Sequence, residues 1–387
     1  MIKKEIAHIR KHFKLDNEML KLFEIFNVYI MKESNEIYHY ERQPFALVDR
    51  EKQELYMANF KKLLTGELDQ KMFELKFQEE AEQPTQVLLH QGLVTGNPEE
   101  WQDLMLLLVE KMLVDTVYEQ DTVITFVRGQ YSRPTKARNE EAEQSEKDEM
   151  FANLFILCSV NSTEQQRKTL MFDYVEREFK YNVFVDPIIK LNTPEQGFFY
   201  PSVTDNYSDV NRILYCTGRA NEPNFQFIEQ VLNAEKTVTA IEERTIFEDI
   251  VKEVTGEQID VATIAHVYEE IHRVIESNEE EEPAKLDYKD VERMLTLSGV
   301  EDVTSEKVER AFQNVVDDKN YEIKASSVLP KFTSKSIRID TKVATITVSP
   351  QDLKYVRQVN YQGKRCILIE VDEDVVIEGF TLSTETL

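Results

Sequence analysis

The spacing of apolar and polar positions divides the first part of the chain into alternating helices and strands. Residues 3–13 have the spacing of an amphipathic helix, and two β-rich runs at 23–31 and 36–40 predict a hairpin. Asp49 is expected to cap a helix whose apolar stripe ends just before Gly66. This segment therefore combines helices with antiparallel strands.

A second strong helix start is predicted at Asn97-Pro98, because Asn accepts hydrogen bonds from free backbone amides and Pro suits the first helical position. Trp101 opens an apolar stripe on that helix and is expected to lie in the core. Short apolar strands are predicted on both sides of residues 138–149, which we expect to form an exposed, mobile acidic loop. Residues 1–223 are therefore expected to form one α+β sheet domain.

The second half of the chain begins with a purely helical pattern. One apolar stripe ends at Gly256, and Asp260 is positioned to cap a second amphipathic helix. Further helices are predicted at 287–298 and from Thr304 onward. Residues 224–319 are thus expected to form a helical module that is rich in acidic side chains.

The last part of the chain returns to a β pattern. Residues 336–340 alternate between polar and apolar side chains, and β-rich runs follow at 343–348 and 366–371. Residues 320–387 are expected to form a small C-terminal β unit. Residues 321–366 contain nine basic and three acidic residues, and we expect these cations to pair with the acidic helices.

Charge and composition limit the classes of function. The chain has 72 acidic and 46 basic residues and a formal net charge of −26, so it should repel the phosphate backbone of nucleic acids. No stretch approaches the roughly 18 apolar residues that a membrane-spanning helix requires, and the opening segment does not have the pattern of a signal peptide. Three cysteines in apolar runs suit buried thiols in a reducing compartment, so we expect a cytoplasmic protein.

The candidate motifs for metal or nucleotide chemistry are weak. His8 and His12 are one helical turn apart, but their neighbours are basic and no third ligand is evident. The chain has no glycine-rich loop with the Lys-Ser/Thr pair that holds phosphate and magnesium. We therefore expect neither a bound metal nor a cofactor.

The most distinctive segment, residues 197–209, contains Tyr200, Asp205, Ser208 and Asp209. Short polar side chains of this kind are typical of turns, where they bond to backbone amides of their own loop. A structural role is therefore the preferred interpretation. The alternative is a polar pocket in which Asp205 and Asp209 bind a divalent ion through their carboxylates.

Several parts of the chain resemble an uncharacterised bacterial family that is catalogued only as a domain of unknown function. The resemblance rests on the opening Lys3-Lys4-Glu5-Ile6-Ala7-x-Ile9-Arg10, on Gly197-Phe198-Phe199-Tyr200-Pro201 with Asp205, Ser208 and Asp209, on Tyr215, and on Arg365-Cys366-Ile367. It extends over nearly the whole chain and implies no catalytic residue, substrate or cofactor. What it implies is an intact cytoplasmic bacterial protein.

These observations favour a non-enzymatic protein-binding or regulatory protein. The candidate partner-binding residues are Tyr200, Asp205, Ser208, Asp209, Glu279, Glu280, Glu281, Glu282, Arg338 and Lys342. One alternative is a hydrolase-like enzyme with a polar or divalent-metal pocket near Asp205 and Asp209. Another is a local contact with nucleic acid through residues 321–366. No membrane contact is expected, and the sequence does not predict an oligomeric state.

Overall fold

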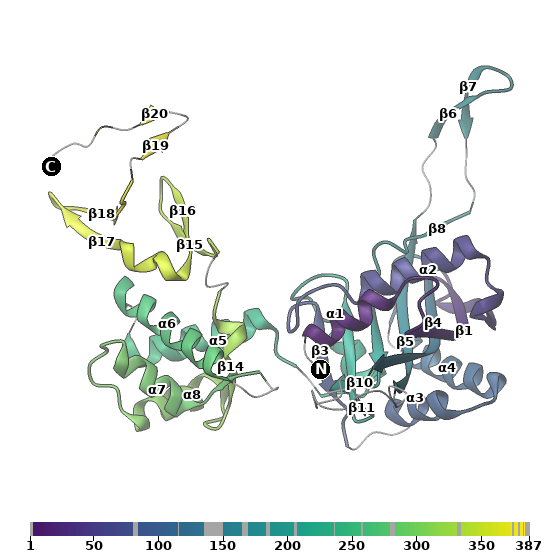
Figure 1. Ribbon diagram of the computed structural model, residues 1–387, viewed down its shortest axis with the longest axis horizontal. Coiled ribbons are helices and arrows are strands. Elements are labelled where there is room, and N and C mark those ends of the chain that lie inside the picture. The colour runs from purple at the N-terminus through teal and green to yellow at the C-terminus, as the bar shows by residue number, and fades with distance from the viewer. Residues whose placement is uncertain are drawn as a thin grey trace, which may run out of the picture. The chain divides into compact units, whose positions relative to one another are not determined.

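The computed structural model divides the chain into two compact units, residues 1–238 and residues 239–387, which are called here the N-terminal and C-terminal units. Both are drawn in Figure 1. The structure describes residues 3–79, 84–114, 116–134, 150–164, 169–182, 186–204, 207–235, 237–256, 258–278, 283–330, 334–373, 375–377, 380–381 and 383. The predicted loop at 138–149 lies outside the described residues.

The N-terminal unit is built on one sheet in which neighbouring strands run antiparallel. The strand order is β2-β1-β4-β5-β9-β12-β3, and β8 pairs with the end of β5. The strands are β1 (Leu20–Met31), β2 (Glu36–Pro44), β3 (Met72–Lys76), β4 (Thr122–Pro134), β5 (Met150–Glu164), β8 (Ile188–Ile189), β9 (Gln196–Tyr200) and β12 (Arg212–Thr217). This sheet confirms the α+β class predicted from the sequence.

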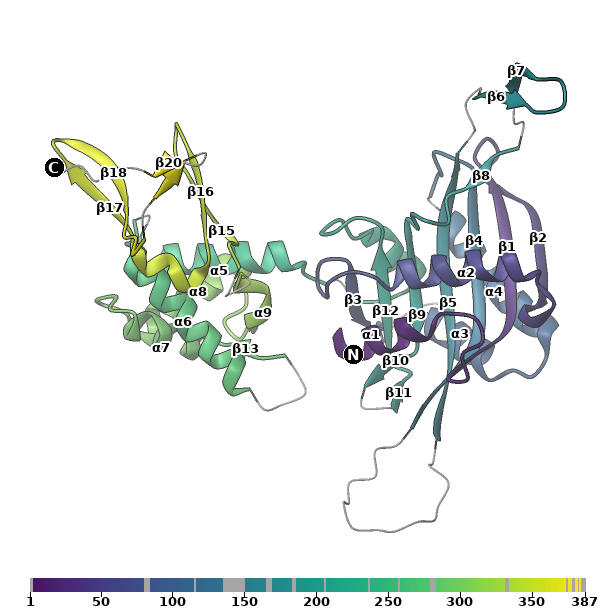
Figure 2. The ribbon, with the colours of Figure 1, turned by 45° about the horizontal axis from the view of Figure 1, so that its top comes forward.

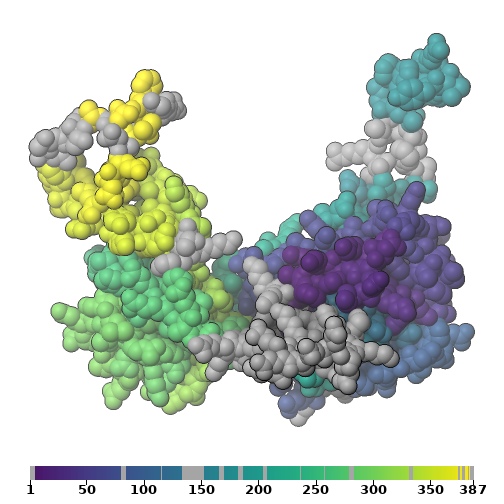
Figure 3. All heavy atoms as spheres, viewed as in Figure 1, coloured from purple at the N-terminus to yellow at the C-terminus, as the bar shows by residue number. Residues whose placement is uncertain are grey.

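The central strands of this sheet are buried on both faces. In β9, Phe198 and Tyr200 point into one apolar core and Phe199 points into the other. Helices cover each face, as Figure 2 shows. The first core is covered by α3 (Thr85–Val94), α4 (Pro98–Leu113) and the short helix η2 (Phe227–Val231); the second is covered by α1 (Lys3–His12), η1 (Phe45–Leu47) and α2 (Arg50–Leu63). Helix α1 forms part of the surface drawn in purple in Figure 3.

Several helix boundaries in this unit follow from local signals that the sequence predicted. The Asn97 side chain accepts a hydrogen bond from the Glu99 amide at 3.0 Å, and Trp101 is fully buried. Helix α2 begins directly after Asp49, as predicted, but the Asp49 side chain makes no capping hydrogen bond and lies 3.5 Å from the Lys52 ammonium instead. The predicted hairpin is β1 and β2, which pair in antiparallel register.

Two further hairpins belong to the N-terminal unit. They are β6 (Thr169–Asp173) with β7 (Glu178–Asn182), and β10 (Ser202–Thr204) with β11 (Tyr207–Asp209). One face of the β6–β7 hairpin carries exposed apolar side chains, among them Leu170 and Phe179. On this hairpin the Lys180 ammonium lies 3.1 Å from the Asp173 carboxylate. The hairpin is thus amphipathic.

The C-terminal unit begins as a helical bundle. Its helices are α5 (Ala240–Thr255), α6 (Val261–Ser277), α7 (Tyr288–Leu297), α8 (Ser305–Val316) and α9 (Ala325–Val328), joined by a short pairing of β13 (Lys285–Leu286) with β14 (Ile323–Lys324). The predicted cap at Asp260 is confirmed, because its side chain accepts a hydrogen bond from the Thr263 amide; the side chains of Asp287 and Thr304 cap their helices in the same way. Gly256 ends α5 at a φ of 86°, where glycine is favoured.

The chain then forms three two-stranded hairpins. They are β15 (Ile337–Asp340) with β16 (Thr345–Val348), β17 (Val356–Tyr361) with β18 (Lys364–Ile369), and β19 (Val376–Ile377) with β20 (Phe380–Thr381). The helix η3 (Pro350–Tyr355) leads into β17. Leu353, Val356 and Ala265 of α6 form a small apolar cluster, which attaches the hairpins to the bundle.

The expected boundaries after residues 223 and 319 do not coincide with the division into two units. The N-terminal unit extends to residue 238 because Phe227 and Ile228 of η2 are buried in the first core of the sheet. Residues beyond 319 remain in the helical bundle because Ile323 pairs with Leu286 and is fully buried there. Within the described residues, no helix is long and apolar enough to cross a membrane.

We expect Gly197→Ala to destabilise the N-terminal unit, because a Cβ at Gly197 would lie 2.1 Å from the carbonyl oxygen of Cys158 on the neighbouring strand. Relieving this overlap requires β5 and β9 to separate, which should lower the free energy of unfolding by about 3 kcal/mol. Trp101 is the only tryptophan of the chain and lies in this unit, so its fluorescence during urea unfolding reports the change.

The matched control is Gly96→Ala, because a Cβ at Gly96 meets no atom within 4 Å. Its free energy of unfolding should stay within about 0.5 kcal/mol of the parent value. Equal unfolding midpoints for the two variants would show that the strands tolerate the added methyl group.

Candidate functional site

Tyr200 is a core residue in the structure. Its ring is fully buried and packs edge-on against Phe77, with 5.9 Å between the ring centroids. The Tyr200 hydroxyl donates a hydrogen bond to the carbonyl oxygen of Val210 at 3.2 Å. Burial, together with the charge of Asp209, raises the pKa of Tyr200. The side chain therefore supports the fold and offers no exposed surface to a partner.

Ser208 and Asp209 make the contacts of turn residues. The Asp209 carboxylate accepts a hydrogen bond from the Asn211 amide at 3.0 Å and lies 3.4 Å from Nε of Arg212. The Ser208 hydroxyl donates to the side-chain oxygen of Asn153 at 2.9 Å. Asp205 lies outside the described residues. The contacts of Asp209 agree with the structural interpretation of this loop.

The remaining sequence candidates lie in the C-terminal unit. Nε of Arg338 lies 2.9 Å from the carboxylate of Asp340, which also accepts a hydrogen bond from Thr345 at 2.8 Å. The bond from Thr345, and then that from Arg338, lowers the pKa of Asp340. Lys342 is exposed in the turn between β15 and β16. Glu279, Glu280, Glu281 and Glu282 lie outside the described residues.

The two N-terminal histidines lie close together on the side of α1 that faces Tyr131. The ring centroids of His8 and His12 are 4.8 Å apart, and the Tyr131 hydroxyl is hydrogen-bonded to Nδ1 of His8. Nδ1 of His12 lies 2.9 Å from the side-chain nitrogen of Asn17. Within the described part of the chain, no three His, Cys, Asp or Glu side chains form a group that could hold a metal ion.

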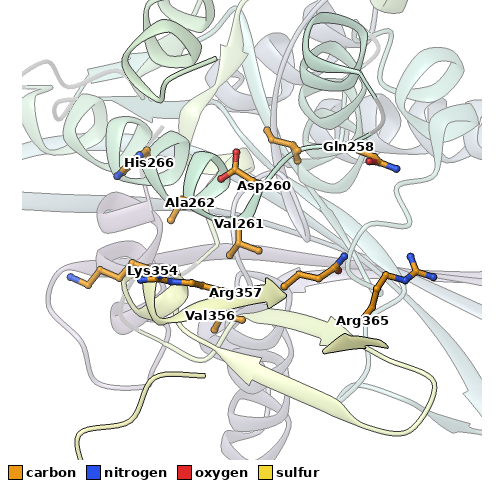
Figure 4. A pocket seen from close by; sticks show the side chains of 12 residues that line it. Gln258, Asp260, Val261, Ala262, His266, Lys354, Val356, Arg357 and Arg365 are labelled. Carbon is orange, nitrogen blue, oxygen red and sulfur yellow. The ribbon is translucent and has the colours of Figure 1, made fainter. Parts of the chain in front are cut away.

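The structure also forms a cleft in the C-terminal unit that sequence patterns did not predict. It has a volume of about 1200 Å³ and lies between the start of α6 and the strands β17 and β18. Figure 4 shows Asp260, Val261 and His266 of the helical side facing Arg357 and Arg365 of the hairpin side. The cleft is lined by Gln258, Ile259, Asp260, Val261, Ala262, Ala265, His266, Lys354, Val356, Arg357, Gln358 and Arg365.

The cleft is basic on its hairpin side. Arg357 lies 2.9 Å from the Glu370 carboxylate, and the Lys354 ammonium lies 5.3 Å from the ring centroid of Tyr355. Arg365 has no carboxylate partner among the residues that the structure describes. Among these cations, Arg365 therefore keeps its charge available to a ligand, and the expected pairing with the acidic helices stays a prediction.

Among the described residues that line the cleft, Asp260 supplies the one carboxylate, and the protein itself engages it. Asp260 accepts hydrogen bonds from the amide and the hydroxyl of Thr263 at 2.9 Å and 2.6 Å. These bonds lower the pKa of Asp260. Its charge is thus directed at the first turn of α6, while Lys354, Arg357 and Arg365 line the opposite side of the cleft.

Of the features of this cleft, only its positive charge could be predicted from the sequence. The excess of basic residues in 321–366 indicated a positive surface, but Val261 and Arg357 are distant along the chain. Their proximity depends on the packing of Leu353 and Val356 against Ala265. Ordinary aliphatic residues make this contact, so no motif marks it.

One protein-family model matches the chain over residues 1–380, and its description is Domain of unknown function (DUF4317). No curated protein and no solved structure matches the chain. The matched segment covers every residue that lines the cleft in the C-terminal unit.

We expect Asp260→Ala to destabilise the start of α6, because the variant loses the cap on the Thr263 amide. The loss should be about 1 kcal/mol at pH 7. The folded-state pKa of Asp260 is lowered, so its contribution is complete above the ordinary value of about 4 and disappears as the pH falls through the lowered value. Hydrogen exchange in the first turns of α6, compared at each pH with the parent chain, measures the difference.

Glu269→Ala is the control, since Glu269 lies on the same helix away from its start. It should leave exchange in the first turn unchanged. If Asp260→Ala exchanged at the parent rate at pH 7, the carboxylate would not be stabilising the helix.

Proposed function

We propose that this chain, which belongs to the family described as Domain of unknown function (DUF4317), is a non-enzymatic binding protein that holds an acidic segment of a partner protein. The observation that carries the proposal is the cleft of the C-terminal unit, with Lys354, Arg357 and Arg365 along one side. We propose the cytoplasm as its compartment, because Cys158 and Cys216 are free, buried thiols.

Charge complementarity supports an anionic ligand. These cations belong to a chain with a formal net charge of −26, so their positive local field contrasts with the negative charge of the chain as a whole. At physiological ionic strength, charges further away than about 8 Å are largely screened, and a ligand inside the cleft senses mainly the nearby cations. A short acidic segment can therefore bind although the whole chain is acidic.

The apolar part of the cleft supports a peptide over a free inorganic anion. Val356 and Ala265 are almost completely buried at its base, and Val261 lines it beside them. Ile369 of the adjoining strand β18 is exposed and lies on the face of that strand that carries Arg365. A peptide with both carboxylates and apolar side chains uses all of these groups, whereas inorganic phosphate uses only the cations.

Nucleic acid is the less favoured anion. A nucleic acid carries a long array of phosphates that extends beyond a local cleft, so the excess negative charge of this chain opposes it. Lys342 and Arg338 lie outside the cleft lining, and Arg338 is paired with Asp340. The basic surface is therefore smaller than the basic composition of residues 321–366 implies.

We expect the full chain to bind a fluorescein-labelled peptide of glutamate and leucine, and the double variant Lys354→Gln/Arg365→Gln to bind it more weakly. Two ion pairs of roughly 0.7 kcal/mol each correspond to a Kd raised about tenfold. Fluorescence anisotropy titration gives the two Kd values. A peptide with glutamine in place of glutamate should bind the parent chain poorly.

The matched control is Lys335→Gln/Lys342→Gln, which removes the same charge outside the cleft. It should change the Kd less than twofold, a difference of about 0.4 kcal/mol. Equal losses for the two double variants would mean that general tail charge, not the cleft, attracts the peptide. Tighter binding of labelled single-stranded DNA than of the acidic peptide would overturn the proposal in favour of nucleic acid.

A further inference from the structure

A second cavity lies within the N-terminal unit, at one end of its sheet. It has a volume of about 440 Å³ and is formed where β4 and β9 begin and where β5 and β12 end. This volume lies in the range of pockets that bind small molecules. The cavity is lined by Thr116, Val117, Tyr118, Glu119, Gln120, Thr122, Ser162, Glu195, Gln196, Tyr215, Thr217, Gly218, Arg219, Glu222 and Asn224.

Tyr118, Gln196 and Ser162 are among the polar side chains of this lining that are more than nine-tenths buried. Tyr118 is 9 % exposed, Gln196 is 8 % exposed and Ser162 is 2 % exposed. Among the residues that the structure describes, the hydroxyls of Tyr118 and Ser162 have no hydrogen-bond partner. Neither hydroxyl is among the fully buried atoms that lack a partner, so both are open to the cavity and can bond to a ligand there.

Gln196 adds a directed donor to the same surface. Its side-chain oxygen accepts a hydrogen bond from the Tyr215 hydroxyl at 3.3 Å, and that hydroxyl accepts one from the Asn224 amide at 3.0 Å. The side-chain nitrogen of Gln196 is left to donate toward the cavity. A complementary ligand therefore needs an acceptor for Gln196 and donors for the two hydroxyls.

The charge around the cavity selects the sign of the ligand. Glu119, Glu195 and Glu222 contribute three carboxylates, whereas Arg219 contributes one cation and lies 3.5 Å from Glu222. Burial, then Cys158 and then Glu195 raise the pKa of Tyr118, so its hydroxyl stays a neutral group beside these carboxylates. Within the described residues these carboxylates do not form a group that could hold a metal ion. Separated carboxylates suit an extended organic cation with several donors.

The walls of the cavity are fixed before any ligand binds. The Asn35 side chain donates to the carbonyl oxygen of Thr116 at 2.8 Å, which ties the loop before β4 to the β1–β2 turn. The Gly218 amide donates to the carbonyl oxygen of Glu195 at 2.6 Å, and a Cβ at Gly218 would lie only 2.7 Å from that oxygen. Such a preformed site loses little free energy to ordering when a ligand binds.

We propose that this cavity binds a small organic cation that carries an amine or guanidinium group together with a hydrogen-bond acceptor. The cation lies among Glu119, Glu195 and the hydroxyl of Tyr118, and the acceptor meets the amide of Gln196. This site is in a different unit from the cleft that binds the acidic segment, so each can be tested while the other is intact.

The probes are arginine, lysine and citrulline, measured by calorimetric titration into the full chain. Each carries a carboxylate acceptor, and citrulline matches arginine in size but has a neutral ureido group in place of the guanidinium. We expect arginine or lysine to bind at millimolar concentration or below, and citrulline to bind about tenfold more weakly than arginine because it lacks the charge. Failure of both cations to bind, or equal binding of arginine and citrulline, would overturn the proposal.

The decisive variant is Glu119→Gln/Glu195→Gln, in which two exposed carboxylates lose their charge without a change in size. It should weaken cation binding about tenfold. The control Glu110→Gln/Glu229→Gln removes the same charge from the N-terminal unit outside the cavity lining and should leave binding unchanged. Equal loss in both variants would mean that total charge attracts the cations. Tighter binding of calcium or magnesium than of the organic cations would identify the site as a metal site and contradict the proposal.

Discussion

Strands β5, β9 and β12 carry large apolar side chains on both faces, so the N-terminal sheet is stable only while helices cover each face. Antiparallel sheets more commonly leave one face in water. Here Phe198 and Tyr215 require α3, α4 and η2 on one side, while Phe199 and Leu214 require α1 and α2 on the other. Because η2 comes late in the chain, this requirement brings residues 227–231 back onto the sheet and sets the end of the unit.

The same arrangement creates the cavity of the N-terminal unit. The helices cover the faces of the sheet, and the cavity lies at one end, where only loops complete the wall. Polar side chains such as Ser162 and Gln196 can therefore be buried among apolar strands and still be reached by a ligand. The C-terminal cleft has another origin, since it lies where a hairpin packs on a helix through a small apolar cluster. The two linings carry opposite charge, since cations predominate in the cleft and carboxylates in the cavity.

Local features of the fold could be predicted from the sequence because their causes are local. Asn97, Asp260 and Asp287 each cap a helix within three residues of their own position, and Gln362-Gly363 forms a turn with positive φ angles. The two candidate sites could not be predicted in this way. Tyr118 precedes β4 and Gln196 begins β9, and both line one cavity because β4 pairs with β5 and β5 with β9; nothing in either local sequence specifies that pairing.

Tyr200 shows that a distinctive local sequence does not by itself indicate a functional site. Its aromatic neighbours between Gly197 and Pro201 looked distinctive, but aromatic side chains are also what a sheet buried on both faces requires. The unusual composition therefore reflected packing. In contrast, Tyr118 and Ser162 have hydroxyls that make no hydrogen bond to the described residues, and they line the cavity. No distinctive sequence pattern surrounds either of them.

Because both faces of the sheet are buried, its strands lack the contrast between a polar and an apolar face that sets the register in sheets with one exposed face. When one face is polar, a shift of one residue exposes every apolar side chain, and the error is strongly penalised. In β9 such a shift would exchange one aromatic ring for another. Alignment then depends on volume: Gly197 is the only glycine in β9 and lies where the Cys158 carbonyl leaves no room for a Cβ, while Phe199 stacks on Phe155 with 5.0 Å between the ring centroids. The absence of a side chain at Gly197 thus fixes the register of β9 against β5.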